Sequence, residues 1–382
     1  MVPEQIPRTA DDFAGIFTLD YIEAIRTRCD VVVVLPRNEG ERRGTWREQT
    51  SDGTEYVVCT SAIRNGGHRR QRLGRVEGLY RVSQTAGLLQ DVDLIHAHGA
   101  VFNGVPAATL GSRLGVPVVL TIHTGPFSKL LERRLTRFLT RRTLERVDCV
   151  CAVSGDLERQ IEVSGIRPRR TEVTYNPVNT ALFRLAQPRA QSKRSILFAG
   201  RLEEYKGGLR AVRAFASVAD RLPGWRLTIA GTGPEFPLIR AFANDNPALR
   251  ERIQLVGSFT RAQFAELLWE SDLFVYPSRH ETFGLVLAEA MSAGLPVVAP
   301  NRAAPPEFVD ERSGVLVEPD DVGEIAAAIE HIATNLTSFD NEAIRARVVE
   351  RFGPDTFGER LLEIYRSLVR PPRRAEKTAC AE

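Results

Sequence analysis

The 382-residue chain lacks any long uncharged apolar run, and no stretch approaches the roughly 18 residues that a transmembrane helix requires. Its N-terminus also lacks the basic, apolar and small-residue pattern of a secretory signal. The five cysteines are odd in number and scattered, and no CxxC pair occurs, which is typical of reduced thiols. We therefore expect a cytoplasmic protein, either free in the cytosol or peripheral at the inner face of a membrane.

Motifs for metal ions and for several common chemistries are also absent. The chain has no HExxH, no DxD between apolar strands and no cluster of His and Asp ligands. It has no GxSxG and no Walker lysine motif. The net charge of +3 is too small to indicate nucleic-acid binding. We therefore expect no metal, no resident cofactor and no nucleic-acid partner.

What the chain does contain is an ordinary globular composition, 43% hydrophobic and 26% charged, over a length that suits two domains. Apolar strand-like runs alternate with amphipathic helical runs almost throughout. This alternation predicts an α/β protein with doubly wound parallel sheets. The expected strands begin near Val31, Thr54, Asp93, Pro117, Val147, Thr171, Ser195, Trp225, Arg252, Leu273, Pro296 and Gly314.

A polar, proline-bearing stretch around residues 185–194 separates two such series and predicts a linker. We accordingly expect an N-terminal domain over residues 1–185 and a C-terminal domain over residues 186–353, with the carboxyl edges of both sheets facing a central cleft. A helix over residues 354–370 is expected to cross back to the first domain, ahead of a disordered tail at residues 371–382. The opening of the chain is unusual, because either the first strand is missing or another segment takes its place.

The most informative segment is HETFGLVLAEAMSAG, which begins at His280. Strands are expected on both sides, so a helix N-terminus should lie at the carboxyl edge of a parallel sheet, where unpaired N–H groups attract phosphate. With Glu281 at the mouth of this helix, Glu289 lies roughly 12 Å along its axis, which fits the span from a sugar across a diphosphate to a ribose. The alternative is a helix cap and an exposed glutamate, but the apolar neighbours of Glu289 favour a partnered carboxylate. The backbone groups expected to contact phosphate and sugar belong to Thr282, Phe283, Gly284 and Leu285.

A second candidate loop is AGRLEEYKGG, in which an expected strand ends at Gly200. Arg201 and Lys206 would offset the charge of a departing diphosphate, although two solvated loop charges give the same pattern. Lys206 is notable because the chain has only four lysines. The turn AGTGPE adds Gly231 and Gly233, which either admit a nucleotide close to the backbone or form a simple tight turn.

Two further features concern the second substrate. His123 follows an expected strand in TIHTG, where it would contact a sugar or an acceptor, or else serve the sheet as a structural histidine. Residues Ser128–Arg146 predict an amphipathic helix with seven basic residues. A solvated helix face is its ordinary interpretation, and the alternatives are contact with an anionic membrane surface or an anionic acceptor.

Taken in order, GRLEEYKGG, AGTGPE, VGSF, SRHETFGLVLAEAMSAGLPVVAP and GVLVEPDD resemble the C-terminal domain of retaining family 4 glycosyltransferases, which have the GT-B fold. The first half agrees more loosely, through DLIHAHG, PVVLTIHTG, VCAVS and YNPVNTALF. The resemblance implies two Rossmann-like domains and a metal-independent, hexosyltransferase-type enzyme. It implies a nucleotide-diphosphate-sugar donor and an acceptor hydroxyl on a glycan, a lipid-linked saccharide or a small molecule.

The resemblance also implies roles for individual residues. Glu289 would hold the ribose hydroxyls, while Glu281 and the amides of residues 283–285 would contact the donor sugar and the diphosphate. The two cations of the GRLEEYKGG loop would stabilise the departing diphosphate. His123 would lie beside the donor sugar, and Gly15 would meet the diphosphate from the first domain.

Two departures from the family pattern bear on this interpretation. First, the strand expected before Gly15 is missing, which a misassigned start or a truncation would explain. Second, Ala303 and Ala304 stand where the family usually has a pair of glycines. Rival interpretations are a sugar phosphorylase or nucleotide-sugar epimerase of the same fold, and a catalytically degenerate, nucleotide-binding or scaffold protein.

Overall fold

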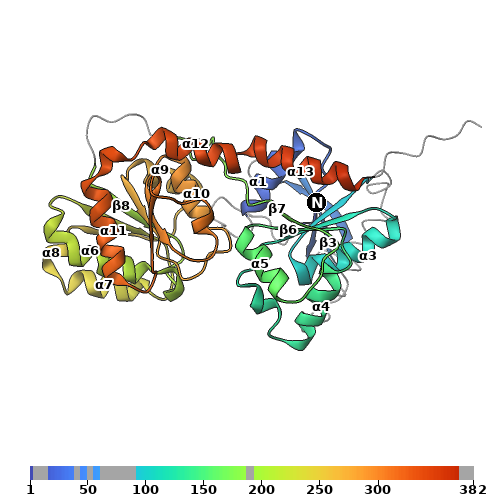
Figure 1. Cartoon of the computed structure of the whole chain (residues 1–382), viewed down its shortest axis with the longest axis horizontal. Coiled ribbons are helices and arrows are strands. Elements are labelled where there is room, and N and C mark those ends of the chain that lie inside the picture. Colours follow the sequence, from blue (N-terminus) through green and yellow to red (C-terminus); the bar gives the residue numbers. More distant parts are fainter. Residues whose placement is uncertain (3–15, 38–43, 50–54, 61–91, 186–192, 370–382) are drawn as a thin grey trace, which may run out of the picture.

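A computed structural model of the chain describes residues 1–2, 16–37, 44–49, 55–60, 92–185 and 193–369. Two lobes of parallel sheet are flanked by helices, and the last two helices run along both lobes (Figure 1). The predicted α/β class with two parallel-sheet units is confirmed. Gly15, most of the predicted linker and the tail from residue 371 lie outside the described residues.

The N-terminal lobe is built on four parallel strands in the order β4-β5-β6-β7. Strands β4 to β6 are completely buried, as expected for strands with helices on both faces. The strands are β4 Ile95–His98, β5 Val118–Ile122, β6 Cys149–Ala152 and β7 Thr171–Val173. The helices described in this lobe are α1 Ile16–Arg26, α3 Val105–Leu114, α4 Arg134–Leu144 and α5 Gly155–Val163.

Met1 and Val2 occupy the place in this sheet where a first strand would lie. Val2 forms a parallel bridge with Ala97, and its N–H donates to the carbonyl of His96 at 2.7 Å. On the other side, the carbonyl of Met1 accepts from the N–H of Val34 at 2.8 Å. This short segment therefore connects β4 to a three-stranded sheet of order β1-β3-β2. Its strands are β1 Val34–Arg37, β2 Gly44–Gln49 and β3 Glu55–Thr60.

The C-terminal lobe contains six parallel strands in the order β10-β9-β8-β11-β12-β13. The strands are β8 Ser195–Ala199, β9 Arg226–Ala230, β10 Ile253–Val256, β11 Leu273–Val275, β12 Val297–Pro300 and β13 Gly314–Val317. The helices are α6 Gly208–Val218, α7 Phe236–Asn244, α8 Pro247–Arg250, α9 Arg261–Trp269, α10 Leu285–Ser292, α11 Val322–Thr334 and α12 Asn341–Phe352. All six predicted strands of this half are present.

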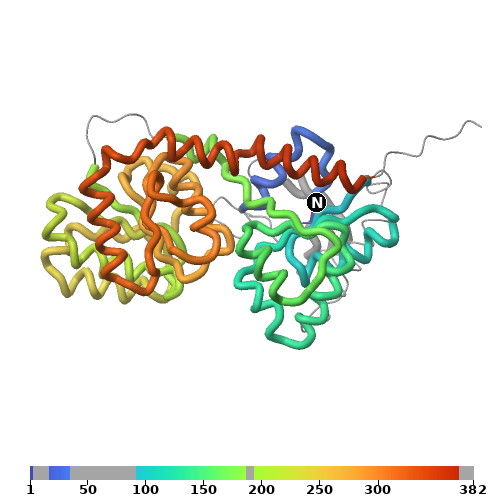
Figure 2. The backbone as a smooth tube through the Cα atoms, viewed as in Figure 1, coloured from blue at the N-terminus to red at the C-terminus, as the bar shows by residue number. Residues whose placement is uncertain are grey.

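Helix α13, Pro354–Leu368, leaves the C-terminal lobe and packs against α1 of the N-terminal lobe (Figure 2). The contact is close, because a Cβ on Gly358 would lie 2.3 Å from the carbonyl oxygen of Ala24. Further along α13, the hydroxyl of Tyr365 lies 2.6 Å from Nδ1 of His96. The helix therefore joins the two lobes along one flank of the molecule (Figure 1).

One helix differs from its prediction. The segment expected to form a single helix over Ser128–Arg146 instead contains a 3-10 turn, Phe127–Leu130, and the shorter helix α4. Arg133 has an extended backbone, with φ −96° and ψ 133°, and this residue separates the two pieces.

Candidate active site between the two sheets

The strand order of the C-terminal sheet reverses between β8 and β11. Ligands of doubly wound sheets bind beyond the carboxyl ends of the strands at such a switch point. The loop after β8 carries Gly200, Arg201 and Lys206, and the loop after β11 carries Glu281 and leads into α10. The topology thus brings two candidate motifs, distant in sequence, to the same edge of one sheet.

Lys206 and Glu281 form an ion pair at this edge. Nζ of Lys206 lies 2.6 Å from Oε1 of Glu281, and the two side chains are only 16% and 10% exposed. The rings of Tyr205 and Tyr276 lie 5.1 and 5.4 Å from the same ammonium group. Burial alone would lower the pKa of Lys206, but Glu281 and the tyrosines outweigh it, so the pKa is raised and the ammonium stays charged.

Arg201 belongs to the same loop but lies in solvent. Its side chain is 69% exposed and contacts Oε1 of Glu203 at 3.0 Å and the hydroxyl of Tyr205 at 2.9 Å. The structure therefore brings Lys206 into contact with Glu281, whereas Arg201 contacts Glu203 and the hydroxyl of Tyr205. Its role at a diphosphate remains a prediction.

The predicted glycine turns pack against one another. A Cβ on Gly231 would lie 1.9 Å from the carbonyl oxygen of Gly200, and one on Gly233 would lie 2.6 Å from that of Leu202. Both glycines also have positive φ values, 140° and 150°. Close packing of the loops after β8 and β9 thus leaves no room for a side chain at either position, and contact of this turn with a nucleotide remains a prediction.

Helix α10 begins directly after Gly284, at the carboxyl edge of the sheet. Gly284 precedes the helix with a φ of 90°, a conformation that favours glycine. The first N–H groups of a helix have no partner within it, and those of α10 begin at Leu285. Phe283, in contrast, is 2% exposed and packs against Phe308 and Phe352. Its side chain therefore belongs to the core, and contact of its backbone with a ligand remains a prediction.

The loop after β5 brings the N-terminal lobe to this site. A Cβ on Gly125 would lie 2.2 Å from Oγ1 of Thr282 and 2.6 Å from Nε2 of His280. The carboxyl edges of the two sheets therefore face each other here, as predicted. Two residues earlier, Nε2 of His123 lies 2.9 Å from Nδ1 of His98, and their rings are stacked. Burial lowers the pKa of His123 to about 3, so the ring is neutral near pH 7 and can serve as a hydrogen-bonding group but not as a cation.

A second contact between the lobes was not predicted. The carboxylate of Glu307 accepts from the N–H groups of Gly155 at 2.9 Å and Asp156 at 2.7 Å. These amides form the N-terminus of α5, so a glutamate of one lobe caps a helix of the other. Glu307 follows the alanine pair that departs from the family pattern, and nothing in its spacing indicates a partner 150 residues earlier.

The third contact involves Glu289, which is 4% exposed. Its Oε1 accepts from Nη2 of Arg261 at 3.0 Å, and the same guanidinium binds both carboxylate oxygens of Asp20, at 2.8 and 2.6 Å. Burial raises the pKa of Glu289 to about 7, with Arg261 opposing the shift. Burial also raises the pKa of Asp20. Within the protein, the partner of Glu289 is thus a cation of α9, and the ribose hydroxyls expected as its partner remain a prediction.

Arg261 and Asp20 are the site residues that the sequence analysis missed. One signal for Arg261 was available, because a cation at the first position of a helix opposes the helix dipole and usually needs a reason. Asp20 carried no such signal, since its partner lies 241 residues away.

Among the residues that the structure describes, no three or more His, Cys, Asp or Glu side chains gather as a metal ion would need. Within the same residues, every helix is too short or too polar to cross a bilayer.

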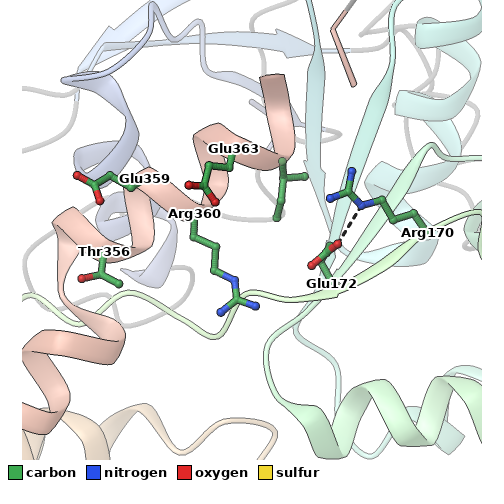
Figure 3. Close-up of a pocket in the computed structure, with 7 residues that line it drawn as sticks. Arg170, Glu172, Thr356, Glu359, Arg360 and Glu363 are labelled. Carbon is green, nitrogen blue, oxygen red and sulfur yellow. Dashed lines mark hydrogen bonds and ion pairs between the residues drawn. The ribbon is translucent and has the colours of Figure 1, made fainter. Parts of the chain in front are cut away.

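A separate polar groove of about 450 Å³ lies between β7 and α13 (Figure 3). Arg170 in this groove is paired with Glu172 at 2.9 Å. None of the predicted donor residues lines the groove.

Comparison with known proteins gives two family matches. The family model for glycosyl transferases group 1 matches residues 193–335, and that for a glycosyl transferase 4-like domain matches residues 14–177. The chain is 28% identical to glycogen synthase of Mycobacterium tuberculosis over 298 residues, or 74% of this chain and 71% of that protein. It is 30% identical over 261 residues to the GDP-mannose:cellobiosyl-diphosphopolyprenol alpha-mannosyltransferase of Xanthomonas campestris, or 65% of this chain and 66% of that protein.

Solved structures share the fold. Sucrose-phosphate synthase from Thermosynechococcus elongatus matches with a TM-score of 0.74 at 20% identity, over 96% of this chain and 98% of that one. Anabaena HepE in complex with UDP matches with a TM-score of 0.73 at 20% identity, over 96% of this chain and 99% of that one.

Proposed function

Because the chain belongs to the group 1 glycosyltransferases and has a glycosyl transferase 4-like domain at its N-terminal end, we propose that it transfers a sugar from a nucleotide-diphosphate donor to an acceptor hydroxyl. The proposed transfer retains the configuration of the sugar and needs no metal ion. The observation that carries the proposal is the buried Lys206–Glu281 pair at the switch point, beside the N-terminus of α10. A fixed cation and a row of amide dipoles meet there, which suits a leaving diphosphate.

The residues on the page suggest a division of labour. The amides at the start of α10 and the ammonium of Lys206 would hold the two phosphates, and the raised pKa of Lys206 keeps it a cation throughout the reaction. As the bond between the anomeric carbon and the diphosphate oxygen breaks, charge builds on that oxygen, next to Lys206. The acceptor oxygen bonds to the anomeric carbon on the same face, and its proton passes to the departing diphosphate. His123, neutral near pH 7 and in contact with His98 through Nε2, would lie beside the donor sugar.

Turnover with a defined donor tests this proposal. Relatives of the chain are named for GDP-mannose, and HepE has been solved with UDP-glucose, so these two donors, UDP-GlcNAc and ADP-glucose form a sensible panel. Release of nucleoside diphosphate would be followed with sugar and lipid-linked acceptors, and the product's anomeric configuration determined by NMR. Activity that survives EDTA supports the metal-independent proposal. Nucleotide binding without turnover on any acceptor would instead favour the degenerate, nucleotide-binding rival.

The acceptor side includes a surface that suits an anionic membrane. On α4, Leu135 and Phe138 lie three residues apart on one face and are 49% and 57% exposed. Arg134, Arg137 and Arg141 belong to the same helix. Exposed apolar side chains among arginines are typical of helices that lie in the headgroup region of anionic bilayers. We therefore propose in addition that the protein lies against an anionic membrane through α4 and uses a lipid-linked acceptor there.

Vesicle sedimentation tests the membrane contact separately from catalysis. We expect binding to phosphatidylglycerol vesicles but not to phosphatidylcholine vesicles, and a loss of binding when Leu135 and Phe138 are both replaced by Gln. Val163→Gln is the matched control, because Val163 is an 88% exposed apolar residue on the neighbouring helix α5. Equal binding by the double variant and the control would exclude α4 as the contact.

A further inference from the structure

Arg261 connects a residue of each lobe through one guanidinium group. Its Nη1 and Nη2 atoms contact the two carboxylate oxygens of Asp20, while Nη2 also contacts Oε1 of Glu289. All three side chains are largely buried, with exposures of 12% for Arg261 and 6% for each carboxylate. The guanidinium also lies over the ring of Phe183, with 5.1 Å between its carbon and the ring centroid. The group is therefore fixed on several sides.

This arrangement is costly as a purely structural device. Three buried charged groups pay a desolvation penalty that their mutual attraction only partly offsets. Arg261 also occupies the first position of α9, where a cation opposes the helix dipole. Nε of Arg261 is buried and finds no acceptor among the described residues. Together these features point to a role other than stability.

We propose that Arg261 is a positioning residue for the nucleotide: it holds Glu289 as an oriented anion for the ribose hydroxyls and ties that anion, through Asp20, to the N-terminal lobe. The proposal rests on the proposed function, since it takes Glu289 to be the ribose acceptor. It adds a residue of α9 that the family motifs do not include, and it makes nucleotide binding depend on the approach of α1.

The chemistry follows from two carboxylates that share one cation. A ribose hydroxyl donates best to an ionised carboxylate, so binding should favour the unprotonated form of Glu289. Removing Arg261 takes away the charge that favours this form. Asp20 competes with Glu289 for the guanidinium and also repels it as a second negative charge. Removing the charge of Asp20 ends both effects and therefore favours ionised Glu289. The two substitutions should therefore act in opposite directions.

The charged groups that face Glu289 in the described part of the chain come from two helices, Arg261 from α9 and Asp20 from α1. The negative charge of Glu23, one turn after Asp20, raises the pKa of Asp20. Asn179, on the segment leading to the linker, also bonds Asp20. From α12, the guanidinium of Arg345 binds the carbonyl of Ser292 at the far end of α10, at 2.6 Å.

The test measures the affinity of UDP, GDP and ADP across pH 5.5 to 8.5 by titration calorimetry, using whichever nucleotide the wild type binds. We expect wild-type affinity to rise with pH around pH 7, where Glu289 loses its proton. Arg261→Gln should move that rise upward by a pH unit or more, with about a tenfold loss at pH 7 that recovers at high pH. Arg261→Lys should restore part of the affinity, and Asp20→Asn should move the rise downward.

The control is Arg221→Gln, which removes an arginine from an exposed pair with Glu330 on a distant surface. If Arg261 had only a structural role, Arg261→Gln would weaken binding equally at every pH, and Asp20→Asn would lack its opposite effect. Either result overturns the proposal. Absence of nucleotide binding by the wild type would instead count against the proposed function. Unchanged pH profiles with intact wild-type binding would count against Arg261 alone.

Discussion

Glu281 and Glu289 stand at the two ends of one motif, yet their surroundings differ. Glu281 has a lysine of its own lobe at 2.6 Å, and the pKa of that lysine is raised, so the ammonium stays charged. Glu289 shares one arginine with Asp20 of the other lobe, and its own pKa is raised to about 7. The first end therefore carries permanent charge, whereas the second end carries a charge that depends on pH and on the approach of α1. In our proposal, the first end serves the departure of the diphosphate and the second end serves the binding of the nucleotide.

The largest effect is expected at the permanently charged end. Lys206→Ala removes the cation that we place beside the leaving diphosphate, and loss of one such stabilising group typically lowers kcat by roughly 10²–10³-fold. Because the charge matters most in the transition state, KM for the donor should change much less. Steady-state kinetics with the active donor measures both values. Arg213→Ala, on the exposed face of α6, is the control, and full activity in the Lys206 variant would remove its leaving-group role.

At the other end, the defect should appear in binding. Glu289→Ala removes an acceptor of ribose hydrogen bonds, and hydrogen bonds to charged groups contribute about 1.5–3 kcal/mol. This corresponds to roughly a 10–100-fold weaker affinity for the donor, with kcat at saturation close to that of the wild type. Calorimetry with the donor and kinetics at saturating donor distinguish the two parameters. A variant that binds donor normally but turns over slowly would reverse the division drawn between the two glutamates.

The pH response of stability gives a smaller and separate comparison. The folded state holds a proton on Glu289 up to about pH 7, whereas the unfolded chain loses it near 4.5. A carboxyl with a raised pKa therefore lowers the stability of the folded state as pH rises through this window. Glu289→Gln cannot titrate, so its free energy of unfolding relative to wild type should increase by about 2 kcal/mol between pH 5 and pH 7.

Urea unfolding at several pH values measures this difference. Glu266→Gln removes an exposed carboxylate from α9, the helix of Arg261, and serves as the control. A parallel response in both variants would mean that Glu289 does not titrate in this window.

The same comparison shows what the sequence could predict. The strands of the C-terminal sheet were predictable because each is a short apolar run between turn residues, and the sheet edge then brought Lys206 and Glu281 together. Burial of Glu289 followed from its apolar neighbours. Asp20 and Arg261 were not predictable, because their contact depends on how one lobe docks on the other. That docking is set by many weak contacts and leaves no spacing to recognise.

The first strand illustrates a second limit. Two residues, Met1 and Val2, complete the hydrogen bonding between β4 and β1. Strand prediction depends on runs of four or more residues with a recognisable pattern. A segment this short carries no periodicity, so its place in a sheet can be found only from the coordinates.

The smallest effect concerns the loop that contacts the Glu281 end. The N–H of Ala304 approaches the carbonyl of Glu281 at 3.5 Å, and the preceding Ala303 has a φ of 58°. The left-handed conformation costs a residue with a Cβ about 1–2 kcal/mol, while glycine adopts it freely. Part of this gain is lost to the greater entropy of glycine in the unfolded chain. Ala303→Gly should therefore stabilise the protein by up to about 1 kcal/mol.

Thermal and urea unfolding check this prediction, with Ala304→Gly as the matched control. Ala304 has a φ of −75° and is 1% exposed, so its replacement removes a buried methyl group and relieves no strain. The neighbouring substitutions should therefore change stability in opposite directions. Because Ala303 carries no titratable group, Ala303→Gly should leave the pH dependence of nucleotide binding unchanged. If that dependence shifted with the loop, the two ends of the motif would be coupled through their shared backbone, and the division between permanent and responsive charge would fail.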